Sequence, residues 1–285
     1  MIPYQQTINT QISCGGIGLH TGKQVNLTLK PAGPDYGIRF IRVDLPGTPV
    51  IQAKDSQVVD TRLATSLGLN GYRIYTVEHL LSALAGMGID NASIEIDSSE
   101  VPIMDGSAAH FTSLLQRVGF KAQENRKKFL RIKRPVTVRE GDKYIHLFPY
   151  SEFKISYTIE FDHPLMQNQS YTLVVKNKTF VEEISRARTF GFLKDVEILK
   201  RNGFAKGGSL ENAVVVDTQG VLNEEGLRYE DEFVRHKILD LIGDLSLVGK
   251  PLLGHIIAYK SGHTLNLAII KKLLSEKENF EITTL

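Results

Sequence analysis

The 285-residue chain has one cysteine and no long hydrophobic segment, and each scarcity excludes a class of protein. With Cys14 alone, it can form neither an intrachain disulfide nor a cysteine-based zinc finger. No apolar run approaches the roughly 20 residues of a membrane-spanning helix. Residues 1–6 lack the basic and apolar segments of a secretory signal, so we expect a cytoplasmic protein. Contact with a membrane surface remains compatible with this composition.

An excess of charge of one sign is also lacking. The 34 basic and 32 acidic residues give a net charge of +2, and no basic run is long enough to follow a nucleic acid backbone. We therefore predict no nucleic acid partner, and nothing in the sequence predicts a stable protein partner. A hydrophobic content of 42% is ordinary for a globular protein, and this length allows two domains.

Residues 233–244 carry two stripes at helical spacing. One stripe is apolar and would face the core; it consists of Val234, Ile238, Leu241 and Leu245. The other is polar, because His236, Asp240 and Asp244 recur every four residues and so share one helix face. His236 and Asp240 can therefore ligate the same metal ion. A catalytic zinc usually takes three protein ligands and a water, so a third ligand is needed.

Residues 77–86 resemble that stretch and supply the third ligand. When His79 is aligned with His236, the apolar residues Val77, Leu81 and Leu84 match Val234, Ile238 and Leu241. This degenerate repeat predicts two copies of one helix packed about a pseudo-twofold axis, with His79 opposite His236. Two ordinary helices with unrelated histidines are the alternative.

Two histidines, one carboxylate and a water describe a hydrolytic zinc site, so we predict one Zn²⁺ per chain on His79, His236 and Asp240. Such a site needs a base for the water, whose pKa zinc lowers to about 7. Glu78 directly precedes His79 and is the candidate base. The alternative is that Glu78 only complements the dipole at the start of a helix.

Cleavage of an acyl bond also needs a group that stabilises the oxyanion and protonates the leaving nitrogen. His263 follows Ser261 and Gly262 at the end of a predicted strand, and Asp244 can orient it and keep it cationic. A simple loop histidine is the alternative. Lys237 has the charge to hold a phosphate, with a solvated lysine as the alternative.

The glycine-rich segment 13–22 is predicted to be a hairpin, since neither a Lys-Ser/Thr pair nor a helix follows it as in a phosphate-binding loop. Its Cys14 and His20 are predicted to be structural. The other histidines lack a setting comparable with that of His263 and are also predicted to be structural; they are His110, His146, His163 and His255.

Along the chain, the patterns predict two α+β domains, residues 1–125 with Glu78 and His79, and residues 126–285 with His236, Asp240, Asp244 and His263. The charged segment 121–128 is the predicted linker. Thr76 is the predicted N-cap of the helix that begins near Glu78, and Asp105 or Ser107 the cap of the helix that follows. A helix or ordered loop is predicted over 192–199, and a last helix from near Leu265.

At this point the sequence resembles a known family, the UDP-3-O-acyl-N-acetylglucosamine deacetylases of lipid A biosynthesis in Gram-negative bacteria. The resemblance covers essentially the whole chain and is carried by the segments 16–22, 76–80, 102–107, 185–191, 233–240 and 260–263. It implies two domains in a β-α-α-β sandwich. It also implies a cytoplasmic zinc amidohydrolase that releases acetate from the 2-acetamido group of UDP-3-O-(3-hydroxyacyl)-N-acetylglucosamine.

The resemblance also assigns roles to further residues. It implies the same zinc ligands and base as above, with His263 as the cationic partner and Asp244 behind it. It implies Thr189 as an oxyanion donor and Phe190 near the sugar. The residues that it places around the nucleotide diphosphate are Lys237, Lys143, Phe161 and Lys260. Those that would line a passage for the acyl chain are Leu193, Val196, Ile198 and Ala205.

Two rival functions stay open at this stage. A metallopeptidase is one, although Glu78 precedes its histidine and the His-Glu-x-x-His signature is absent. A binding or regulatory protein that retains the fold without catalysis is the other. Loss of Glu78 or His263 would mark such a protein, and both residues are present.

Overall fold

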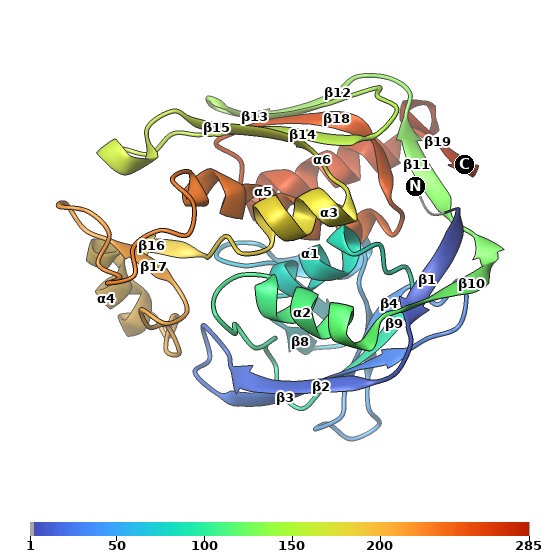
Figure 1. Ribbon diagram of the computed structural model, residues 1–285, viewed down its shortest axis with the longest axis horizontal. Helices are drawn as coiled ribbons and strands as arrows, with labels where there is room; N and C mark the ends of the chain where they lie inside the picture. The colour runs from blue at the N-terminus through green and yellow to red at the C-terminus, as the bar shows by residue number, and fades with distance from the viewer. Residues whose placement is uncertain (1–2, 285) are drawn as a thin grey trace.

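The computed structural model describes residues 3–284, and its two largest sheets enclose a layer of helices (Figure 1). Buried apolar side chains from both sheets and from the helices between them form one continuous core. This β-α-α-β layering is the predicted α+β class. No helix among the described residues is long and apolar enough to cross a membrane.

The sheets of the two halves repeat one topology. The first has the order β2 (Ile12–Ile17), β3 (Gln24–Pro31), β9 (Ala92–Ile96), β4 (Ile38–Arg42), β5 (Val50–Gln52). The second has the order β12 (Val136–Glu140), β13 (Lys143–Phe148), β18 (Leu252–Tyr259), β14 (Phe153–Ile159), β15 (Gln169–Val174). In each, only the third and fourth strands are parallel. The predicted repeat is thus confirmed in the topology, whereas the domain boundary at residue 125 stays a prediction.

The strands follow the alternation of the sequence. In β3, Val25, Leu27 and Leu29 are buried while the residues between them are exposed or half-buried, as expected for a strand with one face on the core. β2 and β3 pair as the antiparallel hairpin predicted for the glycine-rich segment. Two further strands extend the second sheet, β11 (Lys128–Ile132) and β19 (Phe280–Thr284).

The inner layer is built on α1 (Glu78–Gly86) and α5 (Glu232–Leu245), which pack directly against each other (Figure 1). Gly243 permits this approach, because a Cβ atom there would lie 2.1 Å from the carbonyl oxygen of Glu78. α2 (Ala109–Val118) packs on α1, and α6 (His263–Ser275) packs on α5. The polar faces of α1 and α5 therefore meet inside the molecule.

A smaller unit projects from the second half (Figure 1). It contains β16 (Phe190–Phe192), α4 (Leu193–Arg201) and β17 (Val214–Val216), and α4 has no buried residue. The remaining strands are β1 (Tyr4–Ile8), β6 (Val58–Asp60), β7 (Ser66–Leu69), β8 (Tyr72–Ile74) and β10 (Phe120–Arg126). The remaining short helices include α3 (Asn177–Thr179) and a π-helical turn at Phe180–Ile184.

Three sequence predictions differ from the structure. The charged segment 121–128 is mostly strand, because β10 pairs with β1. Most of its side chains are exposed, so it has no apolar period to reveal a strand. Thr76 does not cap α1: Val77 occupies the cap position, and the Thr76 hydroxyl donates to the buried Glu100 carboxylate at 2.9 Å.

The predicted cap of α2 also differs. Ala108 occupies the cap position, and Asp105 instead accepts a hydrogen bond from Arg228 at 2.7 Å. The Ser107 hydroxyl still accepts a bond from the backbone N–H of Ala109, the first residue of α2, at 3.1 Å. α6 begins at His263, close to the predicted start near Leu265.

Candidate metal centre

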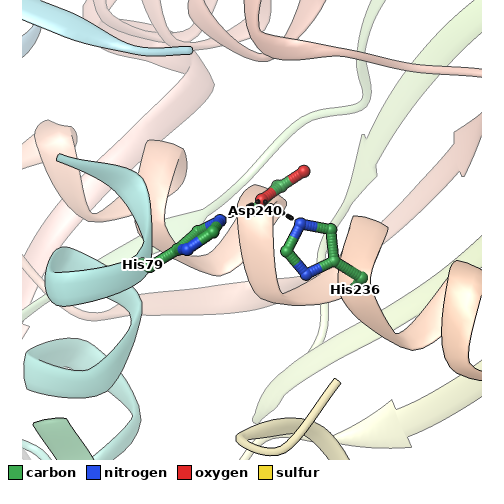
Figure 2. Close-up of side chains that lie close together, drawn as sticks. All are labelled: His79, His236 and Asp240. Carbon is green, nitrogen blue, oxygen red and sulfur yellow. Dashed lines mark ion pairs between the residues drawn. The ribbon is translucent and has the colours of Figure 1, made fainter. Parts of the chain in front are cut away.

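Three buried side chains from α1 and α5 converge at the junction of the two halves (Figure 2). The Nε2 atoms of His79 and His236 lie 3.5 Å and 3.3 Å from Asp240 Oδ1. All candidate ligand atoms of this group lie within 4.8 Å of one another. The predicted third ligand from the other half of the chain is therefore in place beside the helical pair.

The polar atoms of this group suit a cation at its centre. Asp240 Oδ1 points between two imidazoles and has no hydrogen-bond partner among residues 3–284, and neither does His79 Nδ1. His236 Nδ1 bonds to the Ala187 carbonyl at 3.0 Å, which leaves its Nε2 free to ligate. Lys237 Nζ donates to Asp240 Oδ2 at 2.9 Å and fixes that carboxylate.

The ionisation states also match those of ligands. Burial, chiefly, lowers the pKa of His236 to about 3, so its imidazole is neutral at pH 7. Burial opposes the charge of Asp240, but His236 and Lys237 hold the pKa of that carboxyl well below its ordinary value. A neutral imidazole and an ionised carboxylate are the forms that bind a divalent metal ion.

Glu78 lies beside the group and is almost completely buried. Its Oε2 accepts a hydrogen bond of 3.0 Å from the backbone N–H of Thr65. Burial raises the pKa of Glu78, while the nearby His263 and His79 oppose that shift. A carboxyl poised in this way can accept a proton at neutral pH.

His263 forms a close pair with Asp244, Nδ1 to Oδ2, at 2.8 Å. Although burial favours the neutral ring, Asp244 outweighs it and raises the pKa of His263 to about 9. The same carboxylate accepts bonds from Thr65 Oγ1 at 2.5 Å and Asn266 Nδ2 at 2.8 Å. The structure thus brings together the predicted base and the predicted cation around the metal ligands.

The aromatic residues expected near the substrate lie beside the candidate metal ligands. Phe190 lies edge-on to His236 with ring centroids 6.2 Å apart, and Phe161 packs against Phe190 at 5.7 Å. Lys237 Nζ lies 5.5 Å from the centre of the Phe190 ring. Thr189, half-buried in the same segment, is fixed by its backbone N–H, which donates to Gly106 at 2.7 Å. Ala187, whose carbonyl is hydrogen-bonded to His236 Nδ1, lies two residues before Thr189 in the same segment.

Lys143 and Lys260 lie next to each other at one end of the second sheet. Their neighbours Tyr144 and Tyr259 are paired across β13 and β18. Lys260 Nζ donates to Asp142 at 2.5 Å, and its backbone has a φ of 53°. Lys260 is thus paired with Asp142 at the sheet end, where either lysine would meet a substrate that extends that far.

Several residues at the site were not predicted from the sequence. Burial, chiefly, lowers the pKa of His20, which was predicted to be structural; Glu100 opposes this shift, and the nearby His263 and His79 add to it. Its ring packs edge-on against Phe204 at 5.7 Å. The histidine within a glycine-rich hairpin was the only available signal. Thr65 and Asn266 carried none, because single polar residues at no particular spacing are ordinary.

The residues expected along an acyl passage lie on and after α4. Leu193 and Ile198 are exposed large apolar side chains, at 46% and 55% of their surfaces. The backbone N–H of Ala205 bonds to His20 Nδ1 at 3.4 Å, which connects this unit to the vicinity of the metal group.

Comparison with known proteins gives a consistent result. The model of the family described as UDP-3-O-acyl N-acetylglycosamine deacetylase matches residues 5–275. A protein of Syntrophus aciditrophicus named UDP-3-O-acyl-N-acetylglucosamine deacetylase is 52% identical over 97% of this chain and 88% of its own length. Proteins of the same name from Myxococcus xanthus and Saccharophagus degradans are 55% and 52% identical, each over 98% of this chain and over 88% and 93% of their own lengths.

Proposed function

This chain belongs to the UDP-3-O-acyl-N-acetylglucosamine deacetylase family, and we propose on that basis how it acts and on what. It is a deacetylase that hydrolyses the 2-acetamido group of UDP-3-O-(3-hydroxyacyl)-N-acetylglucosamine and releases acetate. The reaction is an early committed step of lipid A biosynthesis. The observation that carries the proposal is the buried group of His79, His236 and Asp240 with Glu78 and His263 beside it.

We propose zinc as the metal, one ion per chain, held by the two Nε2 atoms and Asp240. Two imidazoles and one carboxylate are the ligand set of hydrolytic zinc sites, and the unpartnered Asp240 Oδ1 supports a cation there. A bound zinc ion supplies Lewis acidity for the amide carbonyl and lowers the pKa of a water to about 7.

Glu78 is the proposed general base. Its carboxylate takes the proton from the attacking water, and the bond from Thr65 N–H keeps one of its oxygens fixed. Burial supports this role, because a carboxyl with a raised pKa is a stronger base than an ordinary glutamate.

His263 is the proposed cation and general acid. Asp244 keeps it protonated, so it can stabilise the negative charge on the former carbonyl oxygen. It then gives its proton to the amine that leaves. Thr189 is proposed to donate a second hydrogen bond to the same oxygen.

Substrate binding is proposed for five residues. Phe190 would contact the sugar, because it lies beside ligand His236. The residues proposed for the nucleotide and its diphosphate are Lys237, Lys143, Phe161 and Lys260. Their lysines supply the positive charge that a diphosphate requires. The acyl chain is proposed to follow the apolar side chains of α4.

The two halves, residues 1–125 and 126–285, are proposed to be two domains that build the site jointly. The enzyme is proposed to be cytoplasmic, with peripheral contact to the membrane through its acylated substrate. We propose no nucleic acid and no stable protein partner.

The deciding experiment is acetate release from UDP-3-O-(3-hydroxyacyl)-N-acetylglucosamine by the purified protein. A matched substrate that lacks the 2-acetamido group is the control. Acetate and the free amine in equal amounts support the proposal. Cleavage of peptides without acetate release would instead favour a metallopeptidase, and inactivity on both with metal bound would favour a binding protein.

A further inference from the structure

Thr65 is the one described residue whose hydrogen bonds reach both Glu78 and Asp244. It lies just before β7 and is 2% exposed. Its backbone N–H donates to Glu78 Oε2 at 3.0 Å, and its hydroxyl donates to Asp244 Oδ1 at 2.5 Å. Its own carbonyl accepts a bond from the N–H of Val77 at 3.2 Å, which ties it to the start of α1.

We propose that Thr65 is a positioning residue that holds the base and the partner of the acid in one fixed geometry. This inference rests on the proposed function, in which Glu78 and His263 act on the same amide. Glu78 belongs to α1 and Asp244 to α5, so helix packing alone must otherwise set their separation. Thr65 connects the two carboxylates through a single residue.

The hydroxyl of Thr65 completes the set of side-chain hydrogen bonds to the Asp244 carboxylate. His263 and Asn266 both bond to Oδ2, and Thr65 supplies the bond to Oδ1. Donors on both oxygens hold the buried carboxylate against rotation about its side-chain bond. A hydrogen bond to a charged group is stronger than one between neutral groups, and a buried oxygen left without a donor is costly.

Asn266 also helps to hold the Asp244 carboxylate in this geometry. Its side-chain oxygen accepts a bond of 2.6 Å from the Ser261 hydroxyl, while its amide donates to Asp244. Asn266 therefore fixes Asp244 relative to the first turn of α6, where His263 lies. Thr65 alone extends this network to the base.

The test compares Thr65→Val, which removes the hydroxyl at similar volume, with Thr65→Ser, which keeps it. Thr112→Val is the matched control, because Thr112 in α2 is equally buried and its hydroxyl donates to the carbonyl of Ala108, the cap residue, at 2.9 Å. We expect Thr65→Val to lower kcat by about 10–100-fold, as for other residues that orient a functional side chain. KM and bound metal should stay close to the parent values, and Thr65→Ser should recover most of the rate.

A double-mutant cycle shows whether the hydroxyl acts through Asp244. In the Asp244→Asn background, adding Thr65→Val should cost much less in kcat than it does in the parent, because coupled residues are not additive. An equal cost in both backgrounds, or a Thr65→Val rate equal to that of Thr112→Val, would overturn the inference.

A readout without catalysis separates this inference from the proposed function. In ¹⁵N-histidine-labelled, metal-free protein, the ring signal of His263 is assigned by its loss in His263→Gln. We expect this signal to shift in Thr65→Val and not in Thr65→Ser or Thr112→Val. An unmoved signal overturns the positioning role whatever the activity. A parent that releases no acetate, together with a signal that does shift, overturns the proposed function alone.

Discussion

The rings of His79 and His236 meet edge to face, with centroids 5.0 Å apart and planes at 88°, although more than half the chain separates them in sequence. Each ring comes from the equivalent helix of one half. The same strand order recurs in the sheet on either side of these helices, in line with the predicted repeat. At this junction the proposed metal ligands come from both halves, the proposed base from the first half and the proposed acid from the second.

Glu78→Gln should leave the metal bound and lower kcat by about 10²–10⁴-fold, because general-base catalysis typically contributes that much. The amide keeps the shape of the side chain and cannot take the proton. Rates of acetate release together with metal analysis check this. Glu281→Gln, at the surface, is the control. A Glu78→Gln rate within about twofold of the parent would remove Glu78 from the mechanism.

The pH dependence should be bell-shaped, with His263 responsible for the alkaline limb. Since Asp244 raises the pKa of His263 to about 9, the cation persists through neutral pH, and activity is lost as pH rises through the pKa. A divalent ion nearby favours the neutral ring, so the limb of the metal-loaded enzyme should lie below pH 9. Profiles of kcat/KM against pH measure it.

Two variants test that assignment. Asp244→Asn removes the negative charge that favours the cation, so its alkaline limb should move to lower pH. His263→Gln should lower the rate strongly and flatten or move the alkaline limb while the acidic limb stays. A His263→Gln profile that overlays the parent after scaling would show that another group titrates.

Lys237→Met should weaken metal binding by about 10–100-fold, because partners of metal ligands typically contribute that much. Lys237 Nζ donates to Asp240 Oδ2 at 2.9 Å, and without it this oxygen of the buried carboxylate loses that donor. Competition with a chelator measures the affinity. Lys260→Met is the control, since it removes the same charge from a residue bonded to Asp142. Equal metal affinity in both variants would contradict the role of Lys237.

Gly243→Ala should destabilise the fold by about 1–3 kcal/mol or more, as overpacking does. The added methyl would lie 2.1 Å from the carbonyl oxygen of Glu78, so α1 and α5 must separate at the metal group. Urea unfolding measures the free energy. Gly33→Ala is the control, because no heavy atom lies within 4 Å of its Cβ position. Equal stability of the two variants would show that the helices tolerate separation.

Much of this arrangement could be predicted because its signals are periodic. The four-residue spacing of His236, Asp240 and Asp244 fixes them on one helix face, and the apolar match around His79 predicts the partner helix. These patterns survive in any packing that buries the apolar stripes. The alternation of buried and more exposed residues in β3, β9 and β14 likewise follows a sequence period, that of a strand.

The features that could not be predicted depend on contacts between residues that recur at no regular spacing in the sequence. Thr65 and Asn266 reach Asp244 from separate parts of the chain, so only the folded geometry reveals them. Thr76 is a residue type that often caps helices, but its hydroxyl donates its hydrogen bond to the Glu100 carboxylate instead. The charged strand β10 has too few buried side chains to reveal itself by alternation.

The central claim is that His79, His236 and Asp240 hold one catalytic zinc ion, and the metal content of the purified chain and of Asp240→Ala tests it most directly. The control is Asp44→Ala, which removes an exposed carboxylate paired with Arg42. We predict one zinc per chain in the parent and control, and a much lower content in Asp240→Ala with the circular dichroism spectrum of the parent. A full complement of zinc in folded Asp240→Ala, with parental acetate release, would contradict the account.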